Sequence, residues 1–254
     1  MLLLSWNVNG LRAVHKKGFV DWVGTASPDI LCLQETKASE DQLPADLRPL
    51  AGYHTHYAAA EKKGYSGVAL YSRQQPVGVS AGLGDPAFDR EGRTLIADYG
   101  EYLVASVYFP NGKGSPERLQ YKLAFYDAFL DRMEHARRRG KHIIFCGDVN
   151  TAHRPIDLAR PKENETVSGF LPAERAWLDR VIAAGYCDTL RALDDRPQLY
   201  SWWDLKSGAR ARNVGWRIDY FFIDAGLRHK LKRAFIMPEV QGSDHCPVGI
   251  ELAR

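Results

Sequence analysis

The sequence predicts an α/β fold in which mixed β-sheets are flanked by helices. Strand-like apolar runs recur along the whole chain of 254 residues, and helical patterns separate some of these runs whereas short turns separate others. Helical connections join parallel strands and tight turns join antiparallel strands, so the two together favour mixed sheets over purely parallel ones. No linker or low-complexity tract interrupts the pattern, which predicts a single domain over residues 1–254.

The strands are predicted by apolar runs rich in leucine, isoleucine, valine and aromatic residues. In chain order they are LLLSW (2–6), DILCLQ (29–34), SGVALYS (66–72), TLIADY (94–99), YLVASVYF (102–109), HIIFCGD (142–148), IDYFFI (218–223) and PVGIEL (247–252). The fourth and fifth runs flank Gly100 and predict a β-hairpin.

Two helices are predicted by apolar residues at helical spacing. The first begins after Ser115, an N-cap residue followed by Pro116, and ends in arginines before Gly140. These arginines suit the negative end of the helix dipole, which is a simpler interpretation than a DNA-binding patch. The second helix covers PAERAWLDRVIAAG and is closed by Gly185.

Composition excludes several functional classes. The net charge is only +3, so a nucleic-acid partner is allowed but not required. The four cysteines include no C-x-x-C pair, which argues against a zinc site of that kind and fits a reducing compartment. No signal peptide and no apolar stretch of membrane-spanning length is present, so we expect a soluble, cytoplasmic protein.

Polar side chains gather where the apolar runs stop. In α/β proteins, loops at strand ends deliver ligand-binding side chains to one cleft. Any one of these residues alone is more simply a turn former or a solvated side chain. The strand-end residues are Asn7, Glu35, Tyr108, Asn111, Asp148, Asn150, Asp219, Asp244 and His245.

The segment GSDHCPV (242–248) places Asp244 beside His245 between a Gly-Ser pair and Pro247. Adjacent residues of a regular strand point to opposite faces, so joint use of both side chains requires a turn. A polar turn leading into the last strand is the alternative interpretation of this segment alone. If the strand ends converge, they form a site of hard oxygen ligands with one imidazole, which suits Mg²⁺ or Mn²⁺ and metal-assisted hydrolysis.

Eight motifs in order then show a resemblance that covers essentially the whole chain. They are SWNVNGLRA, LQETK, GYSGVALYS, EGR, YFPNG, CGDVNTAHRPIDL, NVGWRIDYFF and GSDHCPV. Together they resemble the exodeoxyribonuclease III family of apurinic/apyrimidinic endonucleases, within the endonuclease/exonuclease/phosphatase superfamily. The resemblance implies a four-layer α/β sandwich, with two mixed sheets packed face to face and helices outside.

The same resemblance implies a Mg²⁺-dependent DNA repair nuclease, with Mn²⁺ as a substitute cation. It implies hydrolysis of the phosphodiester 5′ to an abasic site in duplex DNA, together with 3′–5′ exonuclease and 3′-end-cleaning activity on 3′-blocked ends, by a monomer. The balance among these activities, and incision at uracil or damaged bases, stay open. The rivals are a superfamily phosphoesterase acting on inositol phosphates or sphingomyelin, and a non-catalytic DNA-binding module.

Metal binding is assigned by the resemblance mainly to Glu35. Asn7, Asp148 and Asn150 stand in the same group, and Asp244 lies near the second metal position of some relatives. Some relatives carry aspartate where this chain has Asn9, so one carboxylate ligand is missing and one or two metals are possible.

Catalytic roles follow from the same motifs. Asp148, oriented by Asn150 and Asn7, partners the attacking water. His245 faces the scissile phosphate, and Asp219 holds the tautomer of His245 by accepting the proton of its other ring nitrogen. Tyr108 donates to a phosphate oxygen. Either Asp148 or Tyr108 takes the water proton, and the Asp148 assignment is simpler because a phenol begins with a pKa of about 10.

DNA contacts are expected near the phosphates and around a flipped sugar. Glycine-rich loops around Tyr65 and Asn111 allow backbone N–H groups to approach an anion. The expected phosphate-facing residues are Arg12, Tyr65, Arg93, Asn111, Lys113 and Lys206. Trp202, Trp216 and Ile218 match the family's pocket for an extruded, base-less sugar, whereas Trp203 is placed equally well there or in the core.

Overall fold

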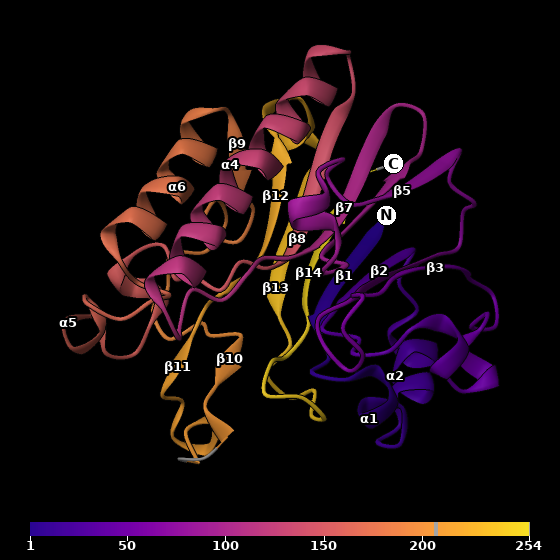
Figure 1. The fold of residues 1–254 in the computed structure, drawn as a ribbon, viewed down its shortest axis with the longest axis horizontal. Coiled ribbons are helices and arrows are strands. Elements are labelled where there is room, and N and C mark those ends of the chain that lie inside the picture. Colours follow the sequence, from indigo (N-terminus) through magenta and orange to yellow (C-terminus); the bar gives the residue numbers. More distant parts are fainter. Residues whose placement is uncertain (206–207, 254) are drawn as a thin grey trace.

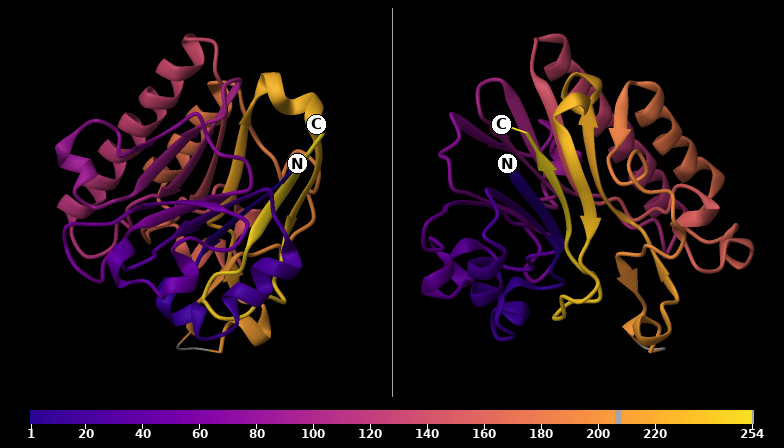
Figure 2. Two further views of the ribbon diagram at one scale, coloured as in Figure 1. Left: turned by 90° about the vertical axis from the view of Figure 1, so that its right-hand side faces the viewer. Right: turned by 180° about the vertical axis from the view of Figure 1, so that it is seen from behind.

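The computed structural model describes residues 1–205 and 208–253. Two six-stranded sheets pack face to face, with helices on both outer faces (Figures 1 and 2). The predicted four-layer sandwich is therefore confirmed, and each of the eight predicted apolar runs contains a strand.

The first sheet has the order β13-β14-β1-β2-β4-β3. Its strands are β1 (Leu2–Asn7), β2 (Ile30–Gln34), β3 (His54–Ala58), β4 (Val68–Ser72), β13 (Leu231–Ile236) and β14 (Val248–Leu252). Only β1 and β2 pair in parallel, so the sheet is mixed as predicted.

The second sheet has the order β5-β6-β7-β8-β12-β9. Its strands are β5 (Gly78–Ala81), β6 (Thr94–Asp98), β7 (Tyr102–Tyr108), β8 (His142–Asp148), β9 (Tyr186–Asp188) and β12 (Asp219–Asp224). The pair β6–β7 forms the predicted antiparallel hairpin, and β7–β8 is parallel. A separate two-stranded ribbon, β10 (Trp202–Trp203) with β11 (Gly215–Trp216), extends from the lower edge in Figure 1.

Within residues 1–205 and 208–253, six α-helices cover the sheets or lie in the connections. They are α1 (Leu11–His15), α2 (Phe19–Ala26), α3 (Pro86–Asp89), α4 (Pro116–Arg138), α5 (Pro161–Asn164) and α6 (Pro172–Ala183), with short 3-10 turns at 40–42, 45–47, 155–157, 210–212 and 225–230. As predicted, Ser115 caps α4 by accepting a hydrogen bond from the Arg118 N–H. In the described part of the chain, no helix combines the length and apolar character needed to cross a bilayer.

The central strands are apolar on both faces because both faces are covered. In β1, Leu3 belongs to the core between the sheets, whereas Leu4 and Trp6 belong to the outer core under α1 and α2. In β8, Ile144 faces the other sheet and Phe145 faces α4 and α6. Alternating burial against two cores accounts for uninterrupted apolar runs in place of an apolar–polar alternation.

The fold brings the strand-end residues to one edge. Because β1 and β2 are parallel, their carboxyl ends carry Asn7 and Glu35 to the same edge of the first sheet. The parallel pair β7–β8 brings Tyr108 level with Asp148 on the facing sheet. The chain termini lie together at the opposite end of the sandwich, where the Met1 amine donates to the Leu252 carbonyl from 2.7 Å (Figure 1).

Candidate active site

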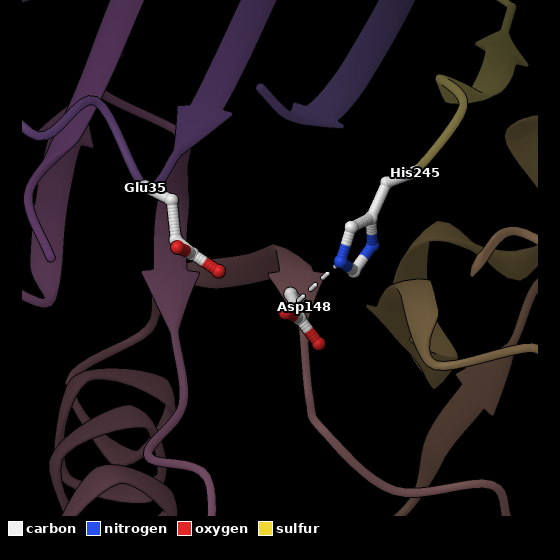
Figure 3. A group of neighbouring side chains, drawn as sticks. All are labelled: Glu35, Asp148 and His245. Atoms are coloured by element: carbon white, nitrogen blue, oxygen red, sulfur yellow. Dashed lines mark ion pairs between the residues drawn. The ribbon is translucent and has the colours of Figure 1, made fainter. Parts of the chain in front are cut away.

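Two carboxylates and one imidazole converge between the ends of the two sheets. Glu35, Asp148 and His245 point toward one another, as Figure 3 shows, and each offers an atom within 4.8 Å of the others. The His245 Nε2 lies 3.8 Å from Asp148 Oδ2. Asp148 and His245 are buried, whereas the Glu35 side chain is 17% exposed. The site therefore opens to solvent on the Glu35 side.

Asn7 connects the carboxylates of the two sheets. Its Nδ2 donates to Glu35 Oε1 from 3.0 Å and to Asp148 Oδ2 from 2.9 Å. Burial raises the pKa of Glu35, but the Lys37 ammonium at 2.9 Å and the Asn7 hydrogen bond outweigh burial and leave that pKa below its usual value. Glu35 is therefore an anion at neutral pH.

Asp148 is oriented by the turn that follows β8. The Asn150 N–H donates to Asp148 Oδ1 from 2.8 Å, and Asn150 adopts a left-handed conformation with φ of 55°. Burial raises the pKa of Asp148 to about 7; the positive charge of His245 opposes this, and the negative charges of Asp219 and Glu35 add to it. A carboxyl that exchanges a proton near neutral pH is suited to general base catalysis.

His245 is held in a buried triad with Asp219 and Ser201. Its Nδ1 lies 2.8 Å from Asp219 Oδ2, which also accepts a hydrogen bond from Ser201 Oγ at 2.7 Å. Burial alone would lower the pKa of His245, but the charges of Asp219 and Asp148 outweigh burial and raise that pKa to about 10. The ring is therefore an imidazolium at neutral pH and can donate a hydrogen bond from Nε2.

The Gly-Ser pair of residues 242–243 forms the turn that the sequence predicted. Gly242 has φ of 123°, a conformation that favours glycine. Ser243 Oγ donates to the Asn7 carbonyl from 2.8 Å and accepts from the His245 N–H at 3.2 Å. This turn directs His245 into the site and fastens its loop to the end of β1.

Asp244 is hydrogen-bonded to Asn9 and to the ribbon. Its Oδ1 accepts from Asn9 Nδ2 at 2.8 Å, and its Oδ2 accepts from the Trp202 indole N–H at 3.0 Å. Burial raises the pKa of Asp244, but the charge of His245 and these hydrogen bonds outweigh burial and lower it. The anion thus connects the histidine loop to Trp202, and Asp244 and His245 line the same pocket.

Tyr108 is half-buried beside Glu35, and Arg93 packs against its ring. The Arg93 guanidinium lies 4.6 Å from the Tyr108 ring centroid and donates to the Tyr108 carbonyl at 2.9 Å. Burial and the nearby charges of Glu35 and Asp148 raise the pKa of Tyr108 well above its usual value. Tyr108 is therefore a neutral phenol, able to donate a hydrogen bond.

An open pocket of about 200 Å³ is lined on one side by Glu35, Asp148 and His245. Trp202 and Trp216 meet edge to face across 6.4 Å, and Ile218 packs with Trp216 in a small apolar cluster. The Lys113 ammonium lies 6.0 Å from the Trp202 ring centroid, and Asn111 donates to Asn150 Oδ1 at 3.0 Å. The pocket thus joins an apolar wall to amide, ammonium and carboxylate groups.

Three of the expected phosphate-facing residues do not line the pocket, namely Arg12, Tyr65 and Arg93. Arg12 is exposed on α1, with Nη2 3.5 Å from the Lys37 carbonyl. Arg93 is only 2% exposed and donates to the Tyr65 hydroxyl at 2.9 Å, so both side chains are already engaged. Lys206 lies outside the described residues, and Trp203 is a core residue, 2% exposed and packed on Cys246.

Sequence reasoning missed several residues of the site. Ser201 and Ser243 orient the histidine and its loop, and Lys37 neutralises Glu35. Ser168 and Gly169 line the pocket. Lys37 could have been noticed as a cation two positions after Glu35, but the roles of the others depend on contacts between distant segments.

The donor set fits a hard divalent cation. Glu35 and Asp148 offer carboxylate oxygens on opposite sides of one gap, and no thiol stands among the pocket-lining residues. Oxygen-rich sites with few protein carboxylates suit Mg²⁺ or Mn²⁺, which retain several waters. A cation held by Glu35 and Asp148, with Asn7 beside them, would activate phosphoester hydrolysis.

The chain is similar to known proteins over nearly its whole length. The model of the Endonuclease/Exonuclease/phosphatase family matches residues 4–245. The chain is 43% identical over 250 residues to the exodeoxyribonuclease of Bacillus subtilis (strain 168), covering 98% of both chains. It is 41% identical over 259 residues to the DNA repair nuclease APEX1 of Danio rerio, covering all of this chain and 82% of that one. The solved structure of the 3′ phosphatase NExo from Neisseria bound to a product DNA hairpin superposes with a TM-score of 0.90 at 28% identity, covering 100% of both chains.

Proposed function

The chain belongs to the endonuclease/exonuclease/phosphatase family, and from that membership we propose that it is a metal-dependent DNA repair nuclease. It hydrolyses the phosphodiester 5′ to abasic sites in duplex DNA, leaving a 3′-hydroxyl and a 5′-deoxyribose phosphate. The observation that carries this proposal is the position of Asp148, which faces Glu35 and His245 and lies in the wall of the same pocket as Trp202 and Trp216.

Asp148 takes the proton of the attacking water. Its Oδ2 accepts from Asn7 and its Oδ1 from Asn150, so its orientation is fixed before substrate binds. The raised pKa of Tyr108 argues against a phenolate base, because that anion would be buried beside two carboxylates. The hydroxide attacks phosphorus, the P–O3′ bond breaks, and the leaving oxygen takes a proton from solvent.

His245 and Tyr108 stabilise the phosphate during this step. The imidazolium Nε2 donates to a non-bridging oxygen, and Asp219 on Nδ1 maintains the charge of the ring. Tyr108 donates from the Glu35 side. A divalent cation, which we propose is Mg²⁺ with Mn²⁺ as a substitute, would be held by Glu35 and Asp148 and would supply charge neutralisation at the phosphate.

Substrate selection rests on the aromatic pocket. A base-less sugar leaves the helix more readily than a paired nucleotide because little stacking or pairing is lost. Trp202, Trp216 and Ile218 line the pocket and form an apolar wall against which we propose that a bare sugar packs. Asn111 and Lys113 of the pocket wall are proposed to contact the flanking phosphates, and so is Arg12, which is exposed on α1. Lys206 is proposed from its sequence position alone.

Exonuclease and 3′-end-cleaning activities use the same groups. A frayed 3′ end presents a terminal phosphoester to the site without any need for extrusion from the helix. The names exodeoxyribonuclease and 3′ phosphatase among the similar proteins support these side activities. A phosphoesterase acting on inositol phosphates or sphingomyelin would need the acidic group but not a pocket for a deoxyribose.

We further propose that the protein acts as a cytoplasmic monomer formed by one domain. The core between the sheets draws on strands from both ends of the sequence, which supports a single folding unit. All four cysteines are free, as expected in a reducing compartment.

The deciding experiment is cleavage of an end-labelled duplex that carries one tetrahydrofuran abasic analogue. With Mg²⁺ we expect a single incision 5′ to the analogue, and with EDTA no incision. Equal cleavage of an undamaged duplex would contradict the proposed selectivity, and cleavage in EDTA would contradict the metal requirement. Inositol phosphates and sphingomyelin serve as substrates of the rival class.

A further inference from the structure

A fully buried ion pair joins the two outer helices behind the pocket. Lys122 of α4 and Glu174 of α6 are both 0% exposed, and Lys122 Nζ lies 2.5 Å from Glu174 Oε1. Figure 1 shows α4 and α6 packed side by side over one face of the second sheet. Neither residue lines the pocket, and the catalytic steps above do not use them.

Lys122 holds the turn that carries Asn150. Its ammonium donates to the Asn150 carbonyl at 2.8 Å and to Thr151 Oγ1 at 2.9 Å, in addition to Glu174. Its three N–H groups thus have three acceptors. Asn150 has φ of 55° and its N–H donates to Asp148 Oδ1, so Lys122 supports the backbone that orients the proposed base.

Glu174 holds the facing wall of the pocket. Its Oε1 accepts from Ser168 Oγ at 2.8 Å, and its Oε2 accepts from the Gly169 N–H at 2.6 Å and the Leu171 N–H at 3.0 Å. Ser168 and Gly169 line the pocket beside Trp216. The Ala152 N–H donates to the Gly169 carbonyl at 2.8 Å, so the two loops also contact each other directly.

Stability alone does not account for such a pair. Removing two charges from water costs several kcal/mol per ion, and apolar residues of similar volume are often as stabilising as a buried ion pair. The hydrogen bonds of this pair to two loops, however, fix positions that an apolar contact would leave free to shift. A displacement of about 1 Å at a reacting group can lower the rate about 10²-fold.

We propose that Lys122 and Glu174 are positioning residues that hold the Asn150 turn and the Ser168–Gly169 wall in register with Asp148. This inference rests on the proposed function of the site. The pair touches neither substrate nor metal, so its loss should slow the chemical step while the phosphate contacts at the pocket rim keep their binding strength.

The test uses the double variant Lys122→Met/Glu174→Leu in the full chain. A single Lys122→Met variant would leave an unpaired buried carboxylate and lose stability for that reason alone. The double variant removes both charges together and keeps the volume. Met133→Ala, further along α4 and equally buried, is the control for lost stability without a change in either loop.

On the abasic duplex we expect kcat of the double variant to fall about 10- to 100-fold with KM changed less than about threefold. Hydrogen exchange measured by mass spectrometry should accelerate at residues 150–152 and 168–171. Met133→Ala should keep kcat despite a lower Tm. A double variant with wild-type kcat, or with unchanged exchange at residues 150–152, would overturn the proposal.

A second variant, Glu174→Gln, tests the proposal independently if the double variant does not fold. Its amide preserves shape but replaces one acceptor oxygen with a donor, so Lys122 and the Gly169 and Leu171 N–H groups can no longer all be satisfied. The same fall in kcat is expected, and wild-type kcat would count against the proposal. If the wild type itself fails to incise abasic DNA, the proposed function is wrong, whereas the exchange measurement still decides whether the pair holds the two loops.

Discussion

The imidazole Nδ1 of His245 lies 2.8 Å from Asp219 Oδ2, and both side chains are buried. The two residues come from different sheets, since Asp219 begins β12 and His245 precedes β14. Their contact therefore joins the sheets at the edge where the proposed substrate binds. The charge of Asp219 is a main reason why the pKa of His245 is raised, so the pair determines the protonation state of the group facing the phosphate.

Asp219→Asn should cripple catalysis and preserve the fold. An amide can donate to Nδ1, which inverts the tautomer, and it removes the charge that stabilises the imidazolium. We expect kcat to fall on the order of 10²- to 10⁴-fold with KM nearly unchanged. Asp224→Asn is the matched control, because Asp224 pairs with His142 at the other end of β12. Wild-type kcat in Asp219→Asn, or an equal loss in the control, would remove the assignment.

Glu35→Gln should abolish most activity at low Mg²⁺, and excess Mn²⁺ should restore part of it. The amide is a weaker ligand for a hard cation, and Mn²⁺ binds a given oxygen site more tightly than Mg²⁺. We expect a loss of several kcal/mol in transition-state stabilisation, equivalent to about 10²- to 10⁴-fold in kcat/KM. The measurement is a metal titration of abasic incision, with Glu101→Gln at the opposite end of the fold as control. An unimpaired variant at low Mg²⁺ would refute the metal assignment of Glu35.

Trp216→Ala should weaken discrimination between abasic and intact nucleotides. The substitution enlarges the apolar wall, so it removes packing on the bare sugar and relaxes the exclusion of a base. The ratio of kcat/KM for abasic and undamaged duplexes should fall about 10- to 100-fold, since one lost ring edge costs roughly 1–3 kcal/mol of discrimination. Trp22→Ala, on α2, controls for the loss of a tryptophan remote from the pocket. If kcat/KM falls by the same factor on the abasic and the undamaged duplex, Trp216 has a structural role and does not select the abasic sugar.

The buried ion pair of Asp157 with Arg217 should make stability depend on pH in acid. Burial raises the pKa of Asp157, but Arg217 at 2.8 Å and Arg191 at 2.8 Å outweigh burial and lower it below the usual value. A lowered native pKa gives stability that is fully present above the unfolded carboxyl pKa of about 3.9 and is lost as pH falls through the native pKa.

Asp157→Asn should therefore lose about 1–3 kcal/mol of unfolding free energy at pH 7, because Arg191 and Arg217 lose their shared anion while Arg217 keeps its pair with Asp188. The difference from wild type should shrink as the pH falls below about 4. Urea unfolding of both proteins at pH 7 and in the acid range measures this difference in unfolding free energy. Asp98→Asn, which breaks the partly exposed pair with Lys141, should cost only about 0–1 kcal/mol. A difference that stays constant with pH would show that the charge of Asp157 is not the source of stability.

Sequence patterns predicted the interior strands well and the edge strands poorly. Interior strands such as β1 and β8 are apolar on both faces, which produces a run that is easy to recognise. The edge strands β3, β5 and β13 carry histidine, serine, lysine or arginine on an exposed face. Their pairing depends on a neighbouring strand distant in sequence, so a local pattern did not predict them.

Polar residues at strand ends were found for a related reason. A carboxylate directly after a buried strand is easy to recognise in a sequence. Strands that end at the same edge of a sheet bring their polar end residues together, so the neighbours of that carboxylate can also be predicted. The burial of Arg93 and Lys122 was not predicted from the sequence, because a cation in a loop or on an amphipathic helix resembles a solvated residue. Each is buried only because its partners arrive from elsewhere, and Glu174 stands 52 residues from Lys122.

The pairing of β1 with β14 makes completion of the site depend on a contact between the two ends of the sequence. Leu2 lies opposite Glu251, so two segments at the extremes of the sequence must meet before the first sheet closes. Such non-local pairing forms late and slowly, since loop closure precedes any gain from contacts. A nascent chain can already contain Asn7, Glu35 and Asp148 and still lack His245 and the strand that anchors it. A chain that ends before residue 245 therefore lacks the imidazole that the proposed mechanism needs at the phosphate.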